Sequence, residues 1–458
     1  MADRSNDPMP PSRREFLRCA ACAALGTAAI TNTIWDLRLV RAATTGAFSD
    51  YKALVCLFLF GGNDANNLII PNSAADYAAY AAARQAIAIP SAQLLSINPT
   101  ISDGRTYGLH PSCAGMQSLF NSGKLAFLCN VGTLVGPVTR TTYQNKTAAL
   151  PPQLFSHNDQ QVQWQTSIPD QPPRTGWGGR AADMVYASNN SNVSMNISLA
   201  GTNIFEVGTH VTPYNVSTTG SVGLSSLSAS RLQAVKDIIA LPHDNLFEKS
   251  FGEITNTAIA NNALLTSALA GAPAIQTVFP NTSLGNQLKM IARLISAHGA
   301  LGHSRQIFFA SVGGYDTHGN QLTAHANLLT ELSGSMKAFY DATVELGLAQ
   351  SVTTFTASDF GRTLPTNGTG TTSGSDHGWG NHQVIMGGAV QGQRLYGTFP
   401  TLAVNGPDDT STGRWIPSTS VDEYSATLAR WFGVSSTDMP TVFPNLTRFA
   451  RPDLGFML

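Results

Sequence analysis

An aspartate and a histidine stand two residues apart in the stretch GGYDTHGNQ, residues 313–321, which follows an apolar run. In an extended backbone, residues two apart project to the same side, so Asp316 and His318 would present a carboxylate and an imidazole together. A charged pair directly after a buried strand needs a partner, because an uncompensated buried charge is costly. The residue types favour a metal ion as that partner over a plain strand-end turn.

Two further apolar runs are also followed by charged residues. In LFLFGGNDANN, Asp64 lies just past the run, and the two glycines before it would let the backbone approach a bound ion. The alternative there is a Gly-Asn-Asp turn with a helix cap. In FTASDFGRT, Asp359 and Arg362 stand on either side of a glycine. The guanidinium fork of Arg362 suits an oxyanion such as phosphate or sulfate, and a structural salt bridge is the alternative.

A segment rich in Gly, Ser and Thr delivers a fourth group, Asp376, His377 and His382, around the start of the apolar run HQVIMGGAV. Two imidazoles and a carboxylate favour a metal or general-acid role over loop hydrogen bonding. Aspartates and histidines without a cysteine suit Zn²⁺, Mn²⁺, Mg²⁺ or Ca²⁺ rather than a thiolate site. The pattern predicts a divalent metal but leaves its identity open.

The elements that would position these groups alternate between strands and helices. Apolar runs predict strands near residues 51–60, 124–132, 305–312 and 382–390, and residues 351–358 also predict a strand. Helical patterns lie near residues 110–123, 228–272 with a break at Pro242, 282–299, 322–348 and 421–434. Continuous apolar strands are typical of a parallel sheet covered on both faces. We therefore predict a doubly wound, mostly parallel α/β sheet flanked by helices, in which ligands bind beyond the carboxyl ends of the strands.

The composition restricts the class of protein further. Hydrophobic residues make up 43% of the 458 residues, which supports a full globular core, and the net charge of −1 argues against nucleic acid as the partner. A segment at about 135–230 is rich in Pro, Gly, Asn and Ser and predicts a loop-rich insertion. Beyond the N-terminal segment, Cys56, Cys113 and Cys129 show neither metal-type spacing nor a disulfide framework.

The N-terminal segment carries an export pattern. Residues 12–17, SRREFL, fit the twin-arginine signature, and an Ala-rich apolar segment follows them. We expect a signal peptide over residues 1–42, with cleavage near Ala42, and a single α/β domain over residues 43–458. The twin-arginine translocase would export the folded protein to the periplasm or the cell exterior. The apolar stretch is too short and too rich in alanine for a stable membrane span, and a cytoplasmic protein with a basic tail is the alternative.

Several stretches resemble, in one order, the large bacterial family called domain of unknown function 1501: LFLFGGNDANNLIIP, LFSHNDQQVQWQTS, TGWGGRAAD, GGYDTHGNQ and SDFGRTLPTNGTGTTSGSDHGWGNHQVIMGGAVQG. Members of this family are placed in the alkaline-phosphatase-like superfamily. The resemblance implies an alkaline-phosphatase/sulfatase-like domain with long loops on its active face. It also implies metal-dependent hydrolysis of phosphate or sulfate esters.

The resemblance assigns metal ligands to each of the four groups: Asp64; Asp316 with His318; Asp359; and His377 or His382. Ser156 stands where a superfamily nucleophile at a helix start is expected, and a helix cap is the alternative. One departure is Phe360, because superfamily phosphatases have a histidine after the aspartate of this motif. The departure puts a complete two-metal site in question.

The expected function is that of an exported metal-dependent hydrolase of a phosphate or sulfate ester. The metal would activate a bound water or Ser156, Arg362 would hold the non-bridging oxygens, and His377 or His382 would assist the leaving group. The alternative is an exported binding or assembly protein that lost the chemistry and binds a cell-envelope or extracellular polymer, which Phe360 favours. An oxidoreductase is disfavoured, because no GxGxxG follows a strand and no cysteine cluster is present.

Overall fold

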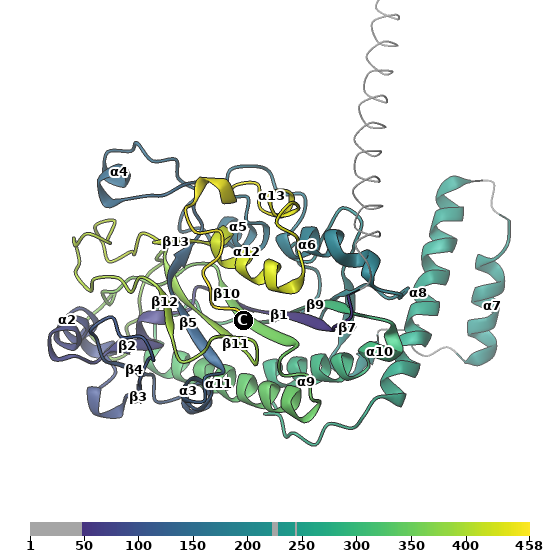
Figure 1. Cartoon of the computed structure of the whole chain (residues 1–458), viewed down its shortest axis with the longest axis horizontal. Helices are drawn as coiled ribbons and strands as arrows, with labels where there is room; N and C mark the ends of the chain where they lie inside the picture. The colour runs from purple at the N-terminus through teal and green to yellow at the C-terminus, as the bar shows by residue number, and fades with distance from the viewer. Residues whose placement is uncertain (1–47, 222–227, 243–244) are drawn as a thin grey trace, which may run out of the picture. The chain divides into compact units, whose positions relative to one another are not determined.

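A computed structural model describes residues 48–221, 228–242 and 245–458 of the chain (Figure 1). The predicted signal peptide over residues 1–42 lies outside the described residues, so export stays a prediction. Among the described residues, no helix has the length and apolar character needed to cross a membrane. Cys56, Cys113 and Cys129 are buried free thiols.

The centre of the described part is a ten-stranded sheet with the order β12-β5-β11-β10-β1-β9-β6-β7-β8, in which β13 also pairs with β5. Its central strands are β5 (Leu125–Gly132), β11 (Asn381–Gly387), β10 (Val352–Ser358), β1 (Lys52–Leu59) and β9 (Arg305–Val312). Strand β1 pairs in parallel with both β10 and β9. All residues of β5 and β10 are buried, as expected for strands that are covered on both faces. The predicted mostly parallel α/β sheet is confirmed.

Strand β11 runs against its neighbours, because it pairs antiparallel with both β10 and β5. The amino end of β11 therefore lies at the same edge of the sheet as the carboxyl ends of β1, β9 and β10. For this reason, the segment that precedes β11 meets the segments that follow the other three strands. The remaining strands are β12 (Leu395–Gly397), β13 (Thr419–Ser420), β6 (Asn196–Ser198), β7 (Tyr214–Ser217) and β8 (Gly220–Ser221), and a separate small sheet holds β2 (Ile69–Pro71), β4 (Tyr107–Leu109) and β3 (Leu95–Ile97).

Helices cover both faces of the sheet (Figure 1). One face packs against α3 (Ala114–Asn121), α9 (Ser283–Ser296) and α11 (Gln321–Glu345), whose apolar residues share one core with β1 and β9. The other face packs against α5 (His157–Thr166), α6 (Trp177–Val185) and α12 (Val421–Phe432). Helix α9 begins after Thr282, whose side chain accepts a hydrogen bond from the backbone N–H of Gly285.

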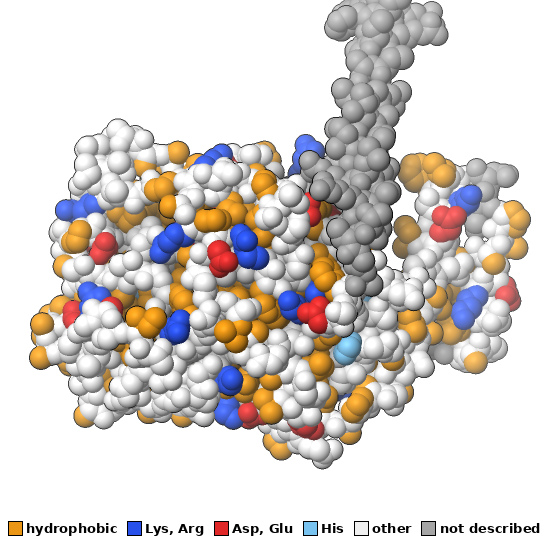
Figure 2. Space-filling model, in the orientation of Figure 1, with side chains coloured by type: hydrophobic (Ala, Val, Ile, Leu, Met, Phe, Trp, Pro, Cys, Tyr) orange, Lys and Arg blue, Asp and Glu red, His pale blue; other side chains and the backbone are white. Residues whose placement is uncertain are grey.

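Two further helices lie on either side of Pro242. These are α7 (Ala229–Ile239) and α8 (Leu246–Gly271). The C-terminal part of α8 buries Leu265 and Leu269 in the core, whereas its N-terminal part exposes Phe247 and Phe251, and apolar atoms show over both helices in Figure 2. The other helices are α2 (Ala74–Arg84), α4 (Arg140–Gln144), α10 (His298–Leu301), α13 (Met439–Val442) and the 3-10 helices Ala65–Asn67, Gln85–Ile87, Ser91–Gln93, Tyr186–Ser188 and Leu446–Arg448.

Candidate metal centre

Four segments bring polar side chains to the edge of the sheet where β1, β9 and β10 end. The segment after β9 carries Asp316 and His318, and the segment after β10 carries Asp359 and Arg362. The segment before β11 carries Asp376 and His377, and the first residue of α5 is His157. The structure thus brings together most of the residues that the sequence selected, and it adds His157 to them.

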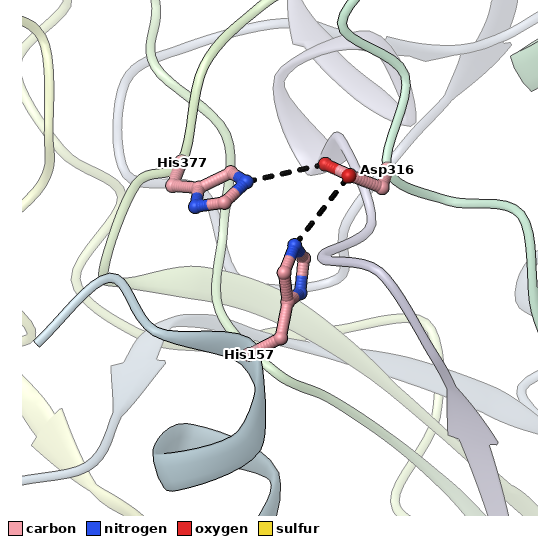
Figure 3. Close-up of side chains that lie close together, drawn as sticks. All are labelled: His157, Asp316 and His377. Carbon is pink, nitrogen blue, oxygen red and sulfur yellow. Dashed lines mark hydrogen bonds and ion pairs between the residues drawn. The ribbon is translucent and has the colours of Figure 1, made fainter. Parts of the chain in front are cut away.

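Asp316 lies at the centre of a cluster with His157 and His377, whose side chains point toward it (Figure 3). One ligand atom of each residue lies within 4.8 Å of the others. His157 Nε2 is 3.5 Å from Asp316 Oδ2, and His377 Nε2 is 3.2 Å from Asp316 Oδ1. His318 joins from the solvent side, with its Nε2 3.0 Å from Asp316 Oδ1 and 2.9 Å from His377 Nε2. Three imidazoles therefore present the same nitrogen to one carboxylate.

Each of the three imidazoles is anchored through its other nitrogen, Nδ1. The acceptors are the Asp359 carboxylate for His157 at 2.7 Å, the Phe155 carbonyl for His377 at 2.8 Å and the Asp376 carboxylate for His318 at 3.1 Å. Because an oxygen acceptor requires the proton on Nδ1, the neutral imidazole keeps its lone pair on Nε2, which faces the cluster. Metal-ligating histidines show this arrangement, in which an outer oxygen fixes the tautomer and the ring orientation.

Two observations show that the cluster suits a cation. His157 Nε2 is buried and has no hydrogen-bond partner among the described residues. With both Nδ1 atoms protonated, the lone pairs of His318 and His377 face each other at 2.9 Å, which is unfavourable unless a proton or a metal ion lies there. Imidazole nitrogens with one carboxylate form a donor set that Zn²⁺ and Mn²⁺ accept. The residues present therefore fit a divalent metal.

Arg362 supports Asp316 from the protein interior. Its side chain is fully buried, and its Nη1 donates to Asp316 Oδ1 at 2.7 Å and to the Gly61 carbonyl at 3.4 Å, while its Nη2 donates to the Ser375 carbonyl. Burial works against ionisation of Asp316, but the hydrogen bond and the charge of Arg362 lower the pKa of this carboxyl below its usual value. The guanidinium is thus directed to protein acceptors, and its role in holding substrate oxygens stays a prediction.

The environments of His157 and His377 shift their pKa values in opposite directions. The hydrogen bond to Asp359 raises the pKa of His157 above its usual value, against the effect of burial. Burial lowers the pKa of His377, although its hydrogen bond to a backbone carbonyl opposes this. The buried ring of Phe360 packs against both imidazoles, with centroid distances of 4.8 and 4.7 Å. His377 is thereby kept neutral and able to bind a metal at neutral pH.

A glycine lets the turn after β1 reach this cluster. A Cβ atom at Gly61, whose φ is +114°, would lie 2.4 Å from the backbone nitrogen of Asp316. The backbone N–H of Gly61 donates to Asp359 Oδ2 at 3.2 Å, and Gln161 Nε2 donates to the same oxygen at 2.8 Å. These donors hold the Asp359 carboxylate against His157 Nδ1, and a direct metal-binding role of Asp359 stays a prediction.

Asp64 lies apart from the Asp316 cluster, although it also follows a central strand. Both of its carboxylate oxygens accept from Nη2 of Arg84, the last residue of α2, and Gln321 Nε2 donates to its Oδ2. The side chains of Asp64 and Arg84 are both fully buried. Arg84 thus supplies the positive charge that the sequence analysis assigned to a metal ion, and a metal-binding role of Asp64 stays a prediction.

The structure does not bring His382 to the cluster. Its Nδ1 accepts a hydrogen bond from the backbone N–H of Asn130 at 3.0 Å, and its ring stacks on Phe399. Burial lowers the pKa of His382 to about 3, so this histidine is neutral. Ser156 occupies the cap position before α5, where its hydroxyl donates to Asp159 Oδ2 at 2.6 Å. The predicted metal-binding role of His382 and the nucleophilic role of Ser156 stay predictions.

His157 is the residue of this cluster that the sequence analysis did not assign. It lies in a segment without strand or helix periodicity, SHNDQQVQWQT, and no apolar run precedes it. The available signal was its place beside Ser156 at an expected helix start.

Fold and site together define an α/β protein with a candidate divalent-metal centre at the strand-end edge of its sheet. A family model described as "Protein of unknown function (DUF1501)" matches residues 51–435, and the chain belongs to this family, as its motifs predict. No curated protein matches the chain.

The chain is also similar to several solved structures. The PsFucS1 sulfatase from Pseudoalteromonas sp. is 11% identical with a TM-score of 0.35, and the match covers 89% of this chain and 72% of that one. The Ps i-CgsB structure is 8% identical with a TM-score of 0.33, over 88% of this chain and 78% of that one. A mutant of the alkaline phosphatase PafA is 12% identical with a TM-score of 0.27, and the match covers 69% of this chain and 64% of that one. These scores are too low to carry an argument about chemistry, which therefore rests on the site itself.

Proposed function

We propose that this protein is an exported, metal-dependent hydrolase that acts on a phosphate or sulfate ester. The observation that carries the proposal is the convergence of three Nε2 atoms on Asp316, with each imidazole anchored through Nδ1. When bound, a divalent metal supplies a Lewis acid that polarises an ester oxygen and lowers the pKa of a water molecule. Export by the twin-arginine translocase to the periplasm or the cell exterior belongs to the same proposal.

In such a site, different residues would bind the metal, keep its carboxylate ligand ionised and transfer a proton. Asp316, His157 and His377 would hold the metal, and three protein ligands are the number found in many catalytic zinc sites. Arg362 keeps Asp316 ionised by donating to its Oδ1. His318 has a side chain that is 45% exposed, and its Nε2 lone pair would accept a proton from the attacking water while Asp376 holds its Nδ1.

A second candidate function is favoured by the ion pair of Arg362 with Asp316. Because the guanidinium lies 2.7 Å from Asp316 Oδ1, the protein itself supplies one positive charge to this carboxylate. A protein that needs no metal at this position would be an exported binding or assembly protein for a cell-envelope or extracellular polymer. The two functions differ in metal content and in ester turnover.

Ester turnover by the full-length protein, supplied with Zn²⁺ or Mn²⁺, tests the hydrolase proposal. Aryl phosphates and aryl sulfates are offered to the wild type, to His157→Ala and to His298→Gln. The control His298 precedes β9, at the end of the strand opposite to Asp316, and stacks on Tyr51. We expect His157→Ala to lose about 10²–10⁴-fold in rate and His298→Gln to keep it. A metal-loaded wild type that hydrolyses neither ester class would contradict the hydrolase and favour the binding protein.

A further inference from the structure

The guanidinium of Arg414 contacts the backbone of His377, a residue of the Asp316 cluster. Its Nε donates to the backbone carbonyl of His377 at 2.8 Å, and its Cζ lies 4.2 Å from the centroid of the Phe155 ring. The carbonyl of Phe155 accepts the Nδ1 proton of His377 at 2.8 Å. Arg414 therefore contacts the metal-cluster histidine and the residue that orients this histidine.

The loop that carries Arg414 is fixed by a buried aspartate. Asp409 is fully buried, and its carboxylate accepts from the backbone N–H groups of Asn405 at 2.8 Å, Gly413 at 2.8 Å and Arg414 at 2.9 Å. The backbone N–H of Thr410 also donates to the carbonyl of Arg414 at 3.1 Å. Because these bonds fix the backbone and Phe155 fixes the plane of the guanidinium, little side-chain entropy remains to be lost on binding a ligand.

The two terminal amino groups of Arg414 remain available to a ligand. Within the described part of the chain they make no hydrogen bond and no ion pair, and only Nε is engaged. Arg362 differs, because its Nη atoms donate to three protein oxygens. Arg414 is half-buried, so part of its hydration is already lost. A guanidinium of this kind favours an anionic acceptor that accepts both Nη groups, such as a phosphate or sulfate group.

A cleft of about 580 Å³ is lined in part by the loop that carries Arg414. It is lined by Thr410 of the Arg414 loop and by Tyr143 and Lys146 of the segment around α4. Tyr143 and Phe155 pack against the same small apolar cluster. The cleft therefore offers one basic residue, Lys146, and several hydroxyl groups to the rest of an anionic substrate.

We infer that Arg414 forms an oxyanion-binding subsite, in which its Nη groups hold the phosphate or sulfate oxygens of the ester beside the metal cluster. Arg414 thereby performs the task that the sequence analysis gave to Arg362. The inference rests on the proposed function as far as ester turnover is concerned. Oxyanion binding itself is measurable without turnover, so the two proposals can fail separately.

Calorimetric titration of inorganic phosphate, and separately of inorganic sulfate, into the full-length protein tests the subsite. The proteins are the wild type, Arg414→Gln and the control Arg430→Gln, whose arginine lies on α12 and pairs with Asp453. We expect Arg414→Gln to weaken binding of the anions by at least about tenfold and Arg430→Gln to leave it unchanged. Equal affinity of the wild type and Arg414→Gln overturns the inference, and so does a wild type that binds neither anion.

A second variant and a kinetic readout separate ligand binding from a structural role. Arg414→Lys keeps the charge but loses the planar fork, so its anion affinity should lie between those of the wild type and Arg414→Gln. For the ester, Arg414→Gln should raise KM by about tenfold or more while the bound metal per protein stays unchanged. A variant that loses metal at unchanged anion affinity overturns the subsite. A wild type that binds metal and anion without turnover supports the subsite and contradicts the hydrolase.

Discussion

Asp64 and Asp316 follow the neighbouring parallel strands β1 and β9, yet their environments differ. The Asp64 side chain is fully buried, and Arg84, which is equally buried, donates to both of its carboxylate oxygens. The Asp316 side chain is 44% exposed. Arg362 donates to Asp316 Oδ1, and Asp316 Oδ2 faces His157. An aspartate after a buried strand is thus a candidate metal ligand where part of its carboxylate stays open to imidazoles and solvent. At Asp64 the protein itself pairs both carboxylate oxygens with a buried guanidinium.

The largest expected effect is the loss of stability when the buried ion pair of Asp64 and Arg84 is broken. Replacing Arg84 by methionine leaves the Asp64 carboxylate buried without its cation, which should lower the free energy of unfolding by about 3–5 kcal/mol. Urea unfolding of the metal-free protein measures this. The double variant Asp64→Asn/Arg84→Met removes both charges and should recover part of the loss. A single variant that is as stable as the wild type would show that the pair does not hold the fold.

Next in size is the effect of the carboxylate that positions His157. The variant Asp359→Asn keeps the shape of the side chain but weakens the hydrogen bond to His157 Nδ1, so metal affinity should fall by about 10–100-fold. Competition with a metal-sensitive dye measures the affinity. The matched control is Asp341→Asn, whose aspartate forms an exposed pair with Lys337 on α11. Equal losses in both variants would mean that Asp359 has no specific role at the cluster.

The smallest expected effect is the pH dependence of the metal-free protein. The folded-state pKa of His157 is raised above 6.5, so its protonated form stabilises the fold. This contribution is fully present below pH 6.5 and is lost as the pH rises through the raised pKa. Urea unfolding across this range should therefore show a decline that His157→Gln lacks, and NMR titration of the imidazole should report the raised pKa directly. An identical pH profile in His157→Gln would contradict the pairing with Asp359.

Much of the fold could be predicted from the sequence, because most of the central strands are apolar runs. Strand β5 is apolar apart from Asn130, whereas β10 holds three threonines and a serine, yet every residue of both strands is buried. The convergence of Asp316 and Asp359 follows from their places directly after parallel strands. His377 joins them only because β11 is antiparallel, and this direction was not predictable, because it depends on the path of the irregular segment that joins β11 to β10.

The residues that distinguish the two aspartates could not be predicted, because their contacts are long-range. His157 and Asp359 are 202 positions apart, and no local pattern links a helix start to that strand end. Arg84 appears in the sequence as an ordinary basic residue in the last turn of a helix, where exposure is the usual expectation. Its burial against Asp64 results from the packing of α2 beside the turn after β1. Sequence patterns thus place carboxylates at an edge but do not reveal which of them the protein neutralises itself.

Metal stoichiometry tests whether Asp316 and His377 belong to a metal-binding site. Zn²⁺ and Mn²⁺ are added to the metal-free full-length wild type, to Asp316→Asn/His377→Ala and to the control Asp341→Asn, and bound metal is counted by elemental analysis and native mass spectrometry. We expect about one equivalent in the wild type and in the control, and none in the double variant, because Asp316 and His377 supply two of the three ligands. A wild type that stays empty, or a double variant that binds as much metal as the wild type, would exclude a metal centre at Asp316.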